Sequence, residues 1–146
     1  MNLQVKLMED LKNAMKSGDQ DTLGVLRMAM SAMNNKKIEK RSKSQPEELT
    51  DEEILDLLSK ELKKRKEAAN LYKTGGREDL AVNEEKEAKI LEKYLPKQLS
   101  REEVEQIISR LNLDKLSFGE AMKIALVELK GKADSKIIAE IIKAKL

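Results

Sequence analysis

Three segments carry the same signature of a helix start, a hydroxyl residue followed three positions later by a glutamate. They are residues 50–53, 100–103 and 117–120. In such a capping box, the hydroxyl oxygen accepts from a backbone N–H of the first turn, and the glutamate accepts from the N–H of the hydroxyl residue. Apolar residues follow each box at spacings of three and four, which is typical of amphipathic helices. The sequence therefore predicts helices joined by turns.

The composition and the positions of glycine and proline agree with an all-α, multihelical chain. Aromatic residues make up 2% and charged residues 38% of the 146 positions, a balance that favours helices over sheets. Gly18 and the pair Gly75-Gly76 end the first and third predicted helices. Pro96 cannot continue the fourth. We expect an N-terminal domain of helical hairpins or a bundle at 1–95 and a small three-helix domain at 96–146.

The chain lacks residues that several classes of enzyme and metal site normally use. The chain contains neither cysteine nor histidine, so it has no thiolate, no imidazole base and no Cys- or His-ligated metal. Its six glycines form no phosphate-binding loop. We expect no catalytic residue, no metal and no cofactor. The sequence shows no membrane-spanning run and no signal-peptide pattern, and we expect a soluble cytoplasmic protein.

Two basic runs and one methionine stripe each allow two interpretations. The cluster at 36–43 is either balanced by the acidic start of the next helix or available to phosphate. Residues 63–66 resemble a nucleic-acid signal, but four consecutive helical residues point around the whole circumference, which favours a solvated surface. Methionines of the second helix suit core packing better than an adaptable groove for a partner.

The stretch 129–136 is the best candidate for a binding surface. Gly131 stands where a helix end needs a residue with positive φ, and Asp134 stands where the next helix needs an N-cap. Lys130, Lys132 and Lys136 concentrate positive charge there. Backbone N–H groups at a helix start add a local preference for anions.

Four motifs resemble those of the YqeY-like family. They are Leu26-Arg27-Met28 with residues 31–35, the Gly-Arg-Glu-Asp-Leu-Ala turn at 76–81, the Tyr-Leu-Pro-Lys-Gln-Leu-Ser run at 94–100, and the Lys-Gly-Lys-Ala-Asp turn at 130–134. This family shares its C-terminal helical domain with the tail of GatB, the B subunit of tRNA-dependent amidotransferases. That tail domain helps to hold tRNA, while amidation takes place on other domains.

The resemblance implies an accessory module that recognises RNA backbone and shape, with tRNA or an amidotransferase or translation-related complex as its partner. Carried over to this chain, the candidate RNA contacts are Lys130, Gly131, Lys132 and Lys136, with Lys123 as a weaker addition. Lys123 stands in a segment where family members often carry a second glycine. Two alternatives remain, an accessory component of a carbon–nitrogen ligase with glutamine as amido-N-donor, and a protein-interaction module without RNA.

Overall fold

The computed structural model describes residues 2–145, and seven α-helices make up its regular structure. These helices form two compact units, and the boundary between the units falls between Leu95 and Pro96. The first unit holds α1 (Leu3–Ser17), α2 (Gln20–Ser42), α3 (Asp51–Thr74) and α4 (Glu78–Glu92); the second holds α5 (Arg101–Arg110), α6 (Phe118–Leu129) and α7 (Ser135–Lys145). The all-α prediction is confirmed.

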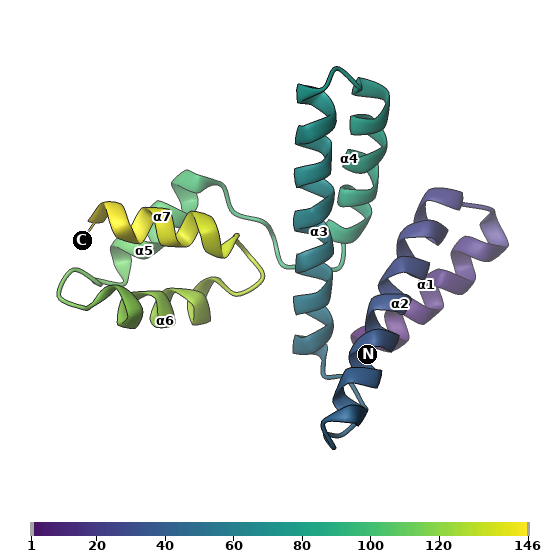
Figure 1. The fold of residues 1–146 in the computed structure, drawn as a ribbon, viewed down its shortest axis with the longest axis horizontal. Helices are drawn as coiled ribbons and strands as arrows, with labels where there is room; N and C mark the ends of the chain where they lie inside the picture. The colour runs from purple at the N-terminus through teal and green to yellow at the C-terminus, as the bar shows by residue number, and fades with distance from the viewer. Residues whose placement is uncertain (1, 146) are drawn as a thin grey trace. The chain divides into compact units, whose positions relative to one another are not determined.

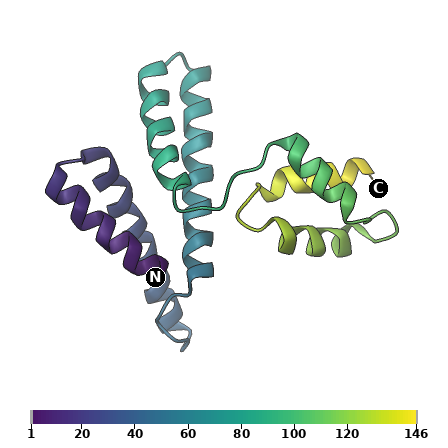
Figure 2. The ribbon, with the colours of Figure 1, turned by 180° about the vertical axis from the view of Figure 1, so that it is seen from behind.

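The first unit consists of two antiparallel hairpins, α1–α2 and α3–α4 (Figures 1 and 2). Helix α2 contacts both α3 and α4, and α1 also reaches α3. The shared core is aliphatic and comprises Leu7, Val25, Leu26, Ala29, Met33, Leu49, Ile54, Leu58, Leu62, Ala88, Leu91 and Leu95. Met33 is 1% exposed, so this member of the methionine stripe is core.

Helix α4 contributes to the core of the first unit. It packs along α3 and also touches α2. Its buried residues include Ala81, which is 0% exposed, whereas Leu80 is only half-buried. A small side chain lets the two helices approach closely. Alanine residues therefore form much of the contact surface of α4, which contains few large apolar residues.

Tyr94 ties the end of the first unit back to its start. Its hydroxyl donates to Asp10 Oδ2 at 2.6 Å, and Lys6 Nζ lies 5.6 Å from its ring centroid. Burial, with the adjacent Asp10 carboxylate, holds the pKa of Tyr94 well above its usual value. The hydroxyl therefore stays a hydrogen-bond donor and fixes the chain just before Pro96.

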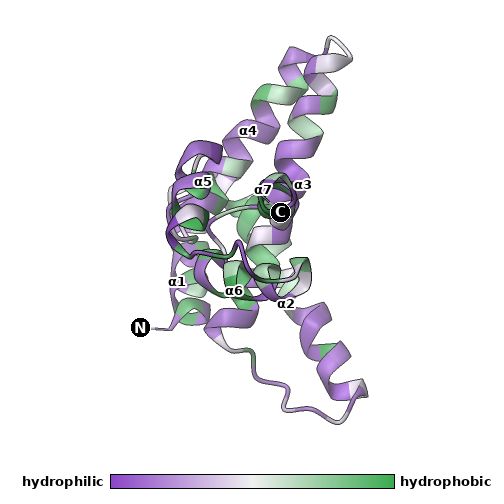
Figure 3. Cartoon of the chain, turned by 90° about the vertical axis from the view of Figure 1, so that its left-hand side faces the viewer, coloured by the Kyte–Doolittle hydropathy of each residue, from purple (hydrophilic) through white to green (hydrophobic). Residues whose placement is uncertain are grey.

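In the second unit, α7 packs against both α5 and α6 around an aliphatic core. The core residues are Val104, Ile108, Leu113, Ala121, Ala125, Leu129, Ile138, Ile141 and Ile142. Colouring by hydropathy shows hydrophobic and hydrophilic residues alternating along the helices (Figure 3). Leu126 is 39% exposed because the buried face of α6 follows Ala121, Ala125 and Leu129 at intervals of four.

Two of the three predicted capping boxes form completely, at Thr50–Glu53 and at Ser100–Glu103. At the third, Ser117 Oγ accepts from the Glu120 N–H at 3.3 Å, while the Glu120 carboxylate receives the Ser117 hydroxyl at 3.2 Å rather than its backbone N–H. The start of α6 is thus capped in one direction only.

Candidate nucleic-acid interface

The turn between α6 and α7 is a type II β-turn. Lys130 has φ −54° and ψ 125°, and Gly131 has φ +73°. The Lys132 N–H donates to the Leu129 carbonyl at 2.9 Å, which closes the turn. These angles match the two central positions of type II, the second of which requires positive φ. Gly131 therefore has the expected left-handed backbone, but it serves a turn that follows the helix end at Leu129 rather than capping the helix itself.

Asp134 caps α7 as predicted. Its Oδ1 accepts from the Lys136 N–H at 3.0 Å, and its carbonyl accepts from the Ile138 N–H at 3.2 Å. Asp134 is half-buried. One of the N–H groups that we expected to attract anions is therefore occupied by this carboxylate, and the lysine side chains must account for most of any anion binding.

The segment that opens the second unit is tied to this turn. Gln98 Nε2 donates to the Gly131 carbonyl at 2.7 Å and to the Pro96 carbonyl at 3.0 Å. The Leu99 N–H donates to the Lys132 carbonyl at 2.9 Å. A methyl group built on Gly131 would lie 3.6 Å from Pro96 Cδ. We call residues 96–99 the staple, because they hold the turn from one side.

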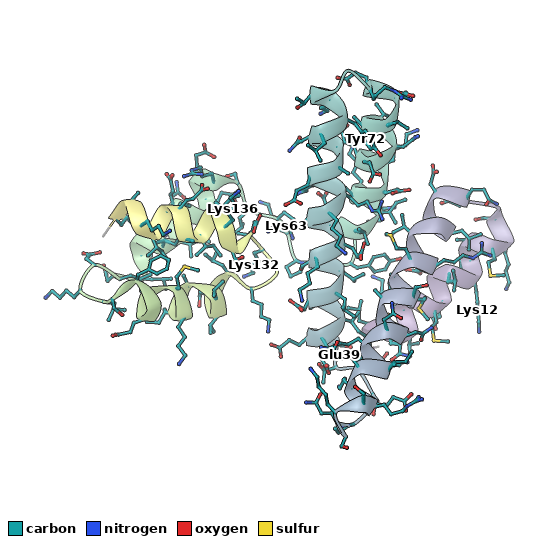
Figure 4. The ribbon with its side chains drawn as sticks, in the orientation of Figure 1. Lys12, Glu39, Lys63, Tyr72, Lys132 and Lys136 are labelled. Atoms are coloured by element: carbon teal, nitrogen blue, oxygen red, sulfur yellow. The ribbon has the colours of Figure 1, made fainter. Side chains whose placement is uncertain are left out.

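The lysines of the turn lie outside these backbone contacts. Lys130, Lys132 and Lys136 are all exposed, and Figure 4 labels Lys132 and Lys136 at the α6–α7 end of the second unit. No carboxylate among residues 2–145 lies within ion-pair distance of Lys132 or Lys136. Two ammonium groups thus project from a backbone that the staple holds in one conformation.

Lys123 lies elsewhere on the same unit. It is exposed in the middle of α6, seven residues before Lys130, which corresponds to about 10 Å along a helix axis. On the helical wheel it stands nearly opposite the buried residues Ala121, Ala125 and Leu129. The structure therefore brings Lys130, Gly131, Lys132 and Lys136 together at the turn, and it places Lys123 along the outer side of α6.

Most cations of the basic cluster at 36–43 pair with carboxylates of the first unit. Lys40 is 8% exposed, and its Nζ donates to the Glu48 carbonyl and to Glu53 Oε1, both at 2.8 Å. This bond from Lys40, with the Thr50 N–H, holds the pKa of Glu53 below its ordinary value. Lys36 and Lys43 pair with Glu39, and Arg41 with Glu47. The predicted balance by the acidic start of α3 is therefore seen for Lys40, whereas the other pairs use carboxylates of α2 and of the loop before α3.

The run at 63–66 is matched by carboxylates in the same way. Lys64 pairs with Glu61, and Lys66 with Glu92 of α4. Arg65 Nη1 lies 3.2 Å from Glu84 and 3.3 Å from Glu87, so it joins α3 to α4. These residues form a charge-balanced helix surface rather than a basic stripe, as the spacing predicted.

The described residues offer less evidence for a metal site, a membrane-spanning helix or a ligand pocket. No group of three or more carboxylates in residues 2–145 is arranged to hold a metal ion. None of the helices described is long and apolar enough to cross a membrane. A groove between α5 and α7 is open and mixed in charge, lined by Arg101, Glu105, Arg110 and Lys145 with their neighbours.

The role of Gln98 was missed by sequence reasoning. The Tyr-Leu-Pro-Lys-Gln-Leu-Ser motif indicated a boundary, and the Lys-Gly-Lys-Ala-Asp motif indicated a turn, but nothing in the spacing joined them. Gln98 and Gly131 are 33 positions apart, and only the three-dimensional structure brings them together. Gln98 stands two residues after Pro96, and its partial burial is visible only in the structure, so the sequence offered no signal for this contact.

Comparison with known proteins identifies relatives over most of the chain. An uncharacterized protein of Schizosaccharomyces pombe is 34% identical over 99 residues, covering 68% of this chain and 76% of that protein. The mitochondrial protein named Altered inheritance of mitochondria protein 41 is 33% identical over 131 residues in Saccharomyces cerevisiae, with 87% of this chain and 68% of that protein covered. Its Kluyveromyces lactis counterpart is 33% identical over 141 residues, covering 94% and 72%.

These names correct the expected cytoplasmic location. Both relatives with a descriptive name are called mitochondrial, which contradicts the location that we assigned because the sequence shows no membrane-spanning run and no signal-peptide pattern. The assignment was wrong because neither of these two observations distinguishes one compartment from another.

The likeness of the tail to GatB remains a prediction, since none of these relatives is described as an amidotransferase. Membership of a family is better supported than the likeness to GatB. A family model described as Yqey-like protein matches residues 4–146, which is nearly the entire chain. The chain therefore belongs to the YqeY-like family.

Proposed function

We propose that the second unit binds the backbone of a structured RNA of the tRNA class through the α6–α7 turn. The observation that carries this proposal is the pair Lys132 and Lys136, which project from a fixed turn without a carboxylate partner among residues 2–145. Lys130 adds to the local positive charge. In the other two basic clusters described above, most of the cations pair with carboxylates, whereas the side chains of Lys132 and Lys136 pair with none in the described part of the chain.

Recognition of shape suits these residues better than recognition of bases. The chain has one phenylalanine, two tyrosines and no tryptophan, which is too few for a stacking platform. Contacts to about three phosphates give a logarithmic salt dependence with a slope of about −2 to −3. Binding is therefore expected to be weak and strongly salt-dependent. The resemblance of the C-terminal domain to the tail domain of GatB, which helps to hold tRNA, supports tRNA as the class of RNA.

The test is a titration of an unmodified tRNA transcript against the full chain at several salt concentrations. The variant Lys132→Ala/Lys136→Ala removes two charges from the turn. Its matched control is Lys64→Ala/Lys66→Ala, which removes the same charge from α3, where both lysines have carboxylate partners. We expect the turn variant to lose about 1.5–2 units of salt slope and the control to keep the wild-type slope.

Two results would remove the site from consideration. One is wild-type affinity in the turn variant. The other is an equal loss in both variants, which would show that binding follows net charge rather than position.

A further inference from the structure

Helix α7 carries a second exposed lysine in line with Lys136. Lys143 follows Lys136 by seven residues, which places both on one face of the helix about 10 Å apart. The opposite face holds Ile138, Ile141 and Ile142, all buried. Lys132 precedes this face at the turn. Lys136 and Lys143 therefore lie on the same outer side of α7, and the exposed Lys132 lies in the turn that precedes the helix.

Lys143 is held by an aromatic ring instead of a carboxylate. Its Nζ lies 5.5 Å from the ring centroid of Phe118, at the start of α6, and the ring is 38% exposed. Such a contact orients an ammonium group without neutralising it. Within residues 2–145, no carboxylate forms an ion pair with Lys143. The full positive charge of Lys143 thus remains available at the far end of the helix.

One acidic residue, Glu140, lies on the same face of α7, between Lys136 and Lys143 in the sequence. Its Oε2 contacts Arg101 Nη1 at 3.1 Å, across to α5. It forms no ion pair with Lys136 or Lys143, although each is one helical turn away. Arg101 therefore reduces the negative charge that Glu140 adds to this face.

We propose that the RNA backbone runs along α7 from Lys132 through Lys136 to Lys143, rather than along α6 past Lys123. This inference rests on the proposed function and extends its site by a residue that the sequence did not single out. Lys123 lies on the outer side of α6, and the outer sides of two helices packed around one core diverge. An RNA backbone that follows α7 therefore does not contact Lys123.

The experiment compares three single variants of the full chain, Lys143→Ala, Lys136→Ala and Lys123→Ala, in titrations with the same tRNA transcript. All three residues are exposed lysines on helices, so each change removes one charge from a similar setting. We expect Lys143→Ala and Lys136→Ala each to reduce the salt slope by about 0.7–0.9, and Lys123→Ala to match the wild type. Circular dichroism confirms that each variant keeps its helices.

The results separate this inference from the proposed function. Loss of slope in Lys136→Ala with wild-type behaviour in Lys143→Ala overturns the path along α7 and leaves the turn as the site. Loss in Lys123→Ala in place of Lys143→Ala moves the path to α6. Wild-type binding by all three variants removes the path along α7, while the proposed function is decided by the double variant at Lys132 and Lys136. No binding by the wild type removes both.

A second variant tests the same path through a gain of binding, which a folding defect cannot produce. Glu140→Gln removes the negative charge between the two lysines and releases Arg101 from one of its two acidic partners. We expect the affinity for the transcript to rise by about twofold or more at low salt, the size of a Coulomb interaction over several ångströms in water. Unchanged or weaker binding by this variant would count against RNA on this face.

Discussion

At the scale of single residues, Gly131 decides the form of the candidate site. Its φ of +73° lies where residues with a Cβ are strained, and the type II turn depends on it. The contact with Pro96 is of ordinary van der Waals length, because an added methyl group would stay 3.6 Å from the ring. The cost of a substitution therefore comes from the backbone angle rather than from a clash.

Gly131→Val is expected to destabilise the second unit by about 1–2 kcal/mol, because a β-branched residue is strained at positive φ. Gly131→Asn is the control, since asparagine tolerates the left-handed region better. Urea unfolding followed by circular dichroism measures both. An unchanged midpoint for the valine variant would mean that the turn adopts another form in solution.

At the scale of elements, Arg65 connects three helices of the first unit. It contacts Glu61 on its own helix, Glu84 and Glu87 of α4, and the Met28 sulfur of α2. Burial raises the pKa of Glu87; the charge of Arg65 opposes this rise, while Glu84 and Asp21 add to it. One guanidinium thus offsets the repulsion among several partly buried carboxylates.

Arg65→Met is expected to cost about 1–3 kcal/mol at pH 7, since it leaves Glu84 and Glu87 without their partner. A carboxyl whose folded-state pKa is raised destabilises the fold when it is ionised. Without Arg65 that pKa rises further, so the variant should recover part of its loss as the pH falls from 7 toward the ordinary glutamate value of 4.5.

Urea unfolding at pH 7 and pH 5 measures this difference, with Lys64→Met as the control because Lys64 is a well-exposed neighbour on the same helix. A constant difference between Arg65→Met and the wild type across this pH range would show that the carboxylates do not depend on Arg65.

The helices themselves were accessible from sequence, because their determinants are local. Capping boxes at Thr50 and Ser100, and apolar residues at intervals of three and four, indicate each start and buried face within a few residues. The exceptions involve contacts between elements. Ala81 is fully buried because α3 lies against it, and Met15 is 58% exposed because α1 has only one face covered. Neither fact has a signal in the local pattern.

The candidate site follows the same rule. The lysines, the positive φ of Gly131 and the cap at Asp134 are local features, and the sequence predicted them. Gln98 and Phe118 reach the site from distant positions, so their contacts with Gly131 and Lys143 appeared only in the structure.

At the scale of the whole molecule, the division between Leu95 and Pro96 separates two cores. Leu95 packs in the first core, and Tyr94 is bonded to Asp10. Pro96 instead meets Gly131 of the second unit. The chain thus passes from the first core to the second unit across one peptide bond. Whether each unit folds alone is a separate question, and a unit of 51 residues is small for independent stability.

We expect the fragment 96–146 to be helical in isolation but only marginally stable, and the fragment 100–146, which lacks the staple, to be less stable. Thermal unfolding followed by circular dichroism compares the two, and amide NMR spectra show whether fragment 96–146 keeps the structure it has in the full chain. Equal stability of the fragments would mean that residues 96–99 contribute nothing to the fold. A disordered longer fragment would mean that the units depend on each other.

The bond between Gln98 and the Gly131 carbonyl has a kinetic consequence. It joins positions 33 residues apart, so its formation carries the entropic cost of closing a long loop, and we expect the local helices to form before it. The lysine-bearing corner should then be among the last parts of the protein to become ordered during refolding. It should also be among the first to exchange its amide hydrogens with solvent when the native state opens.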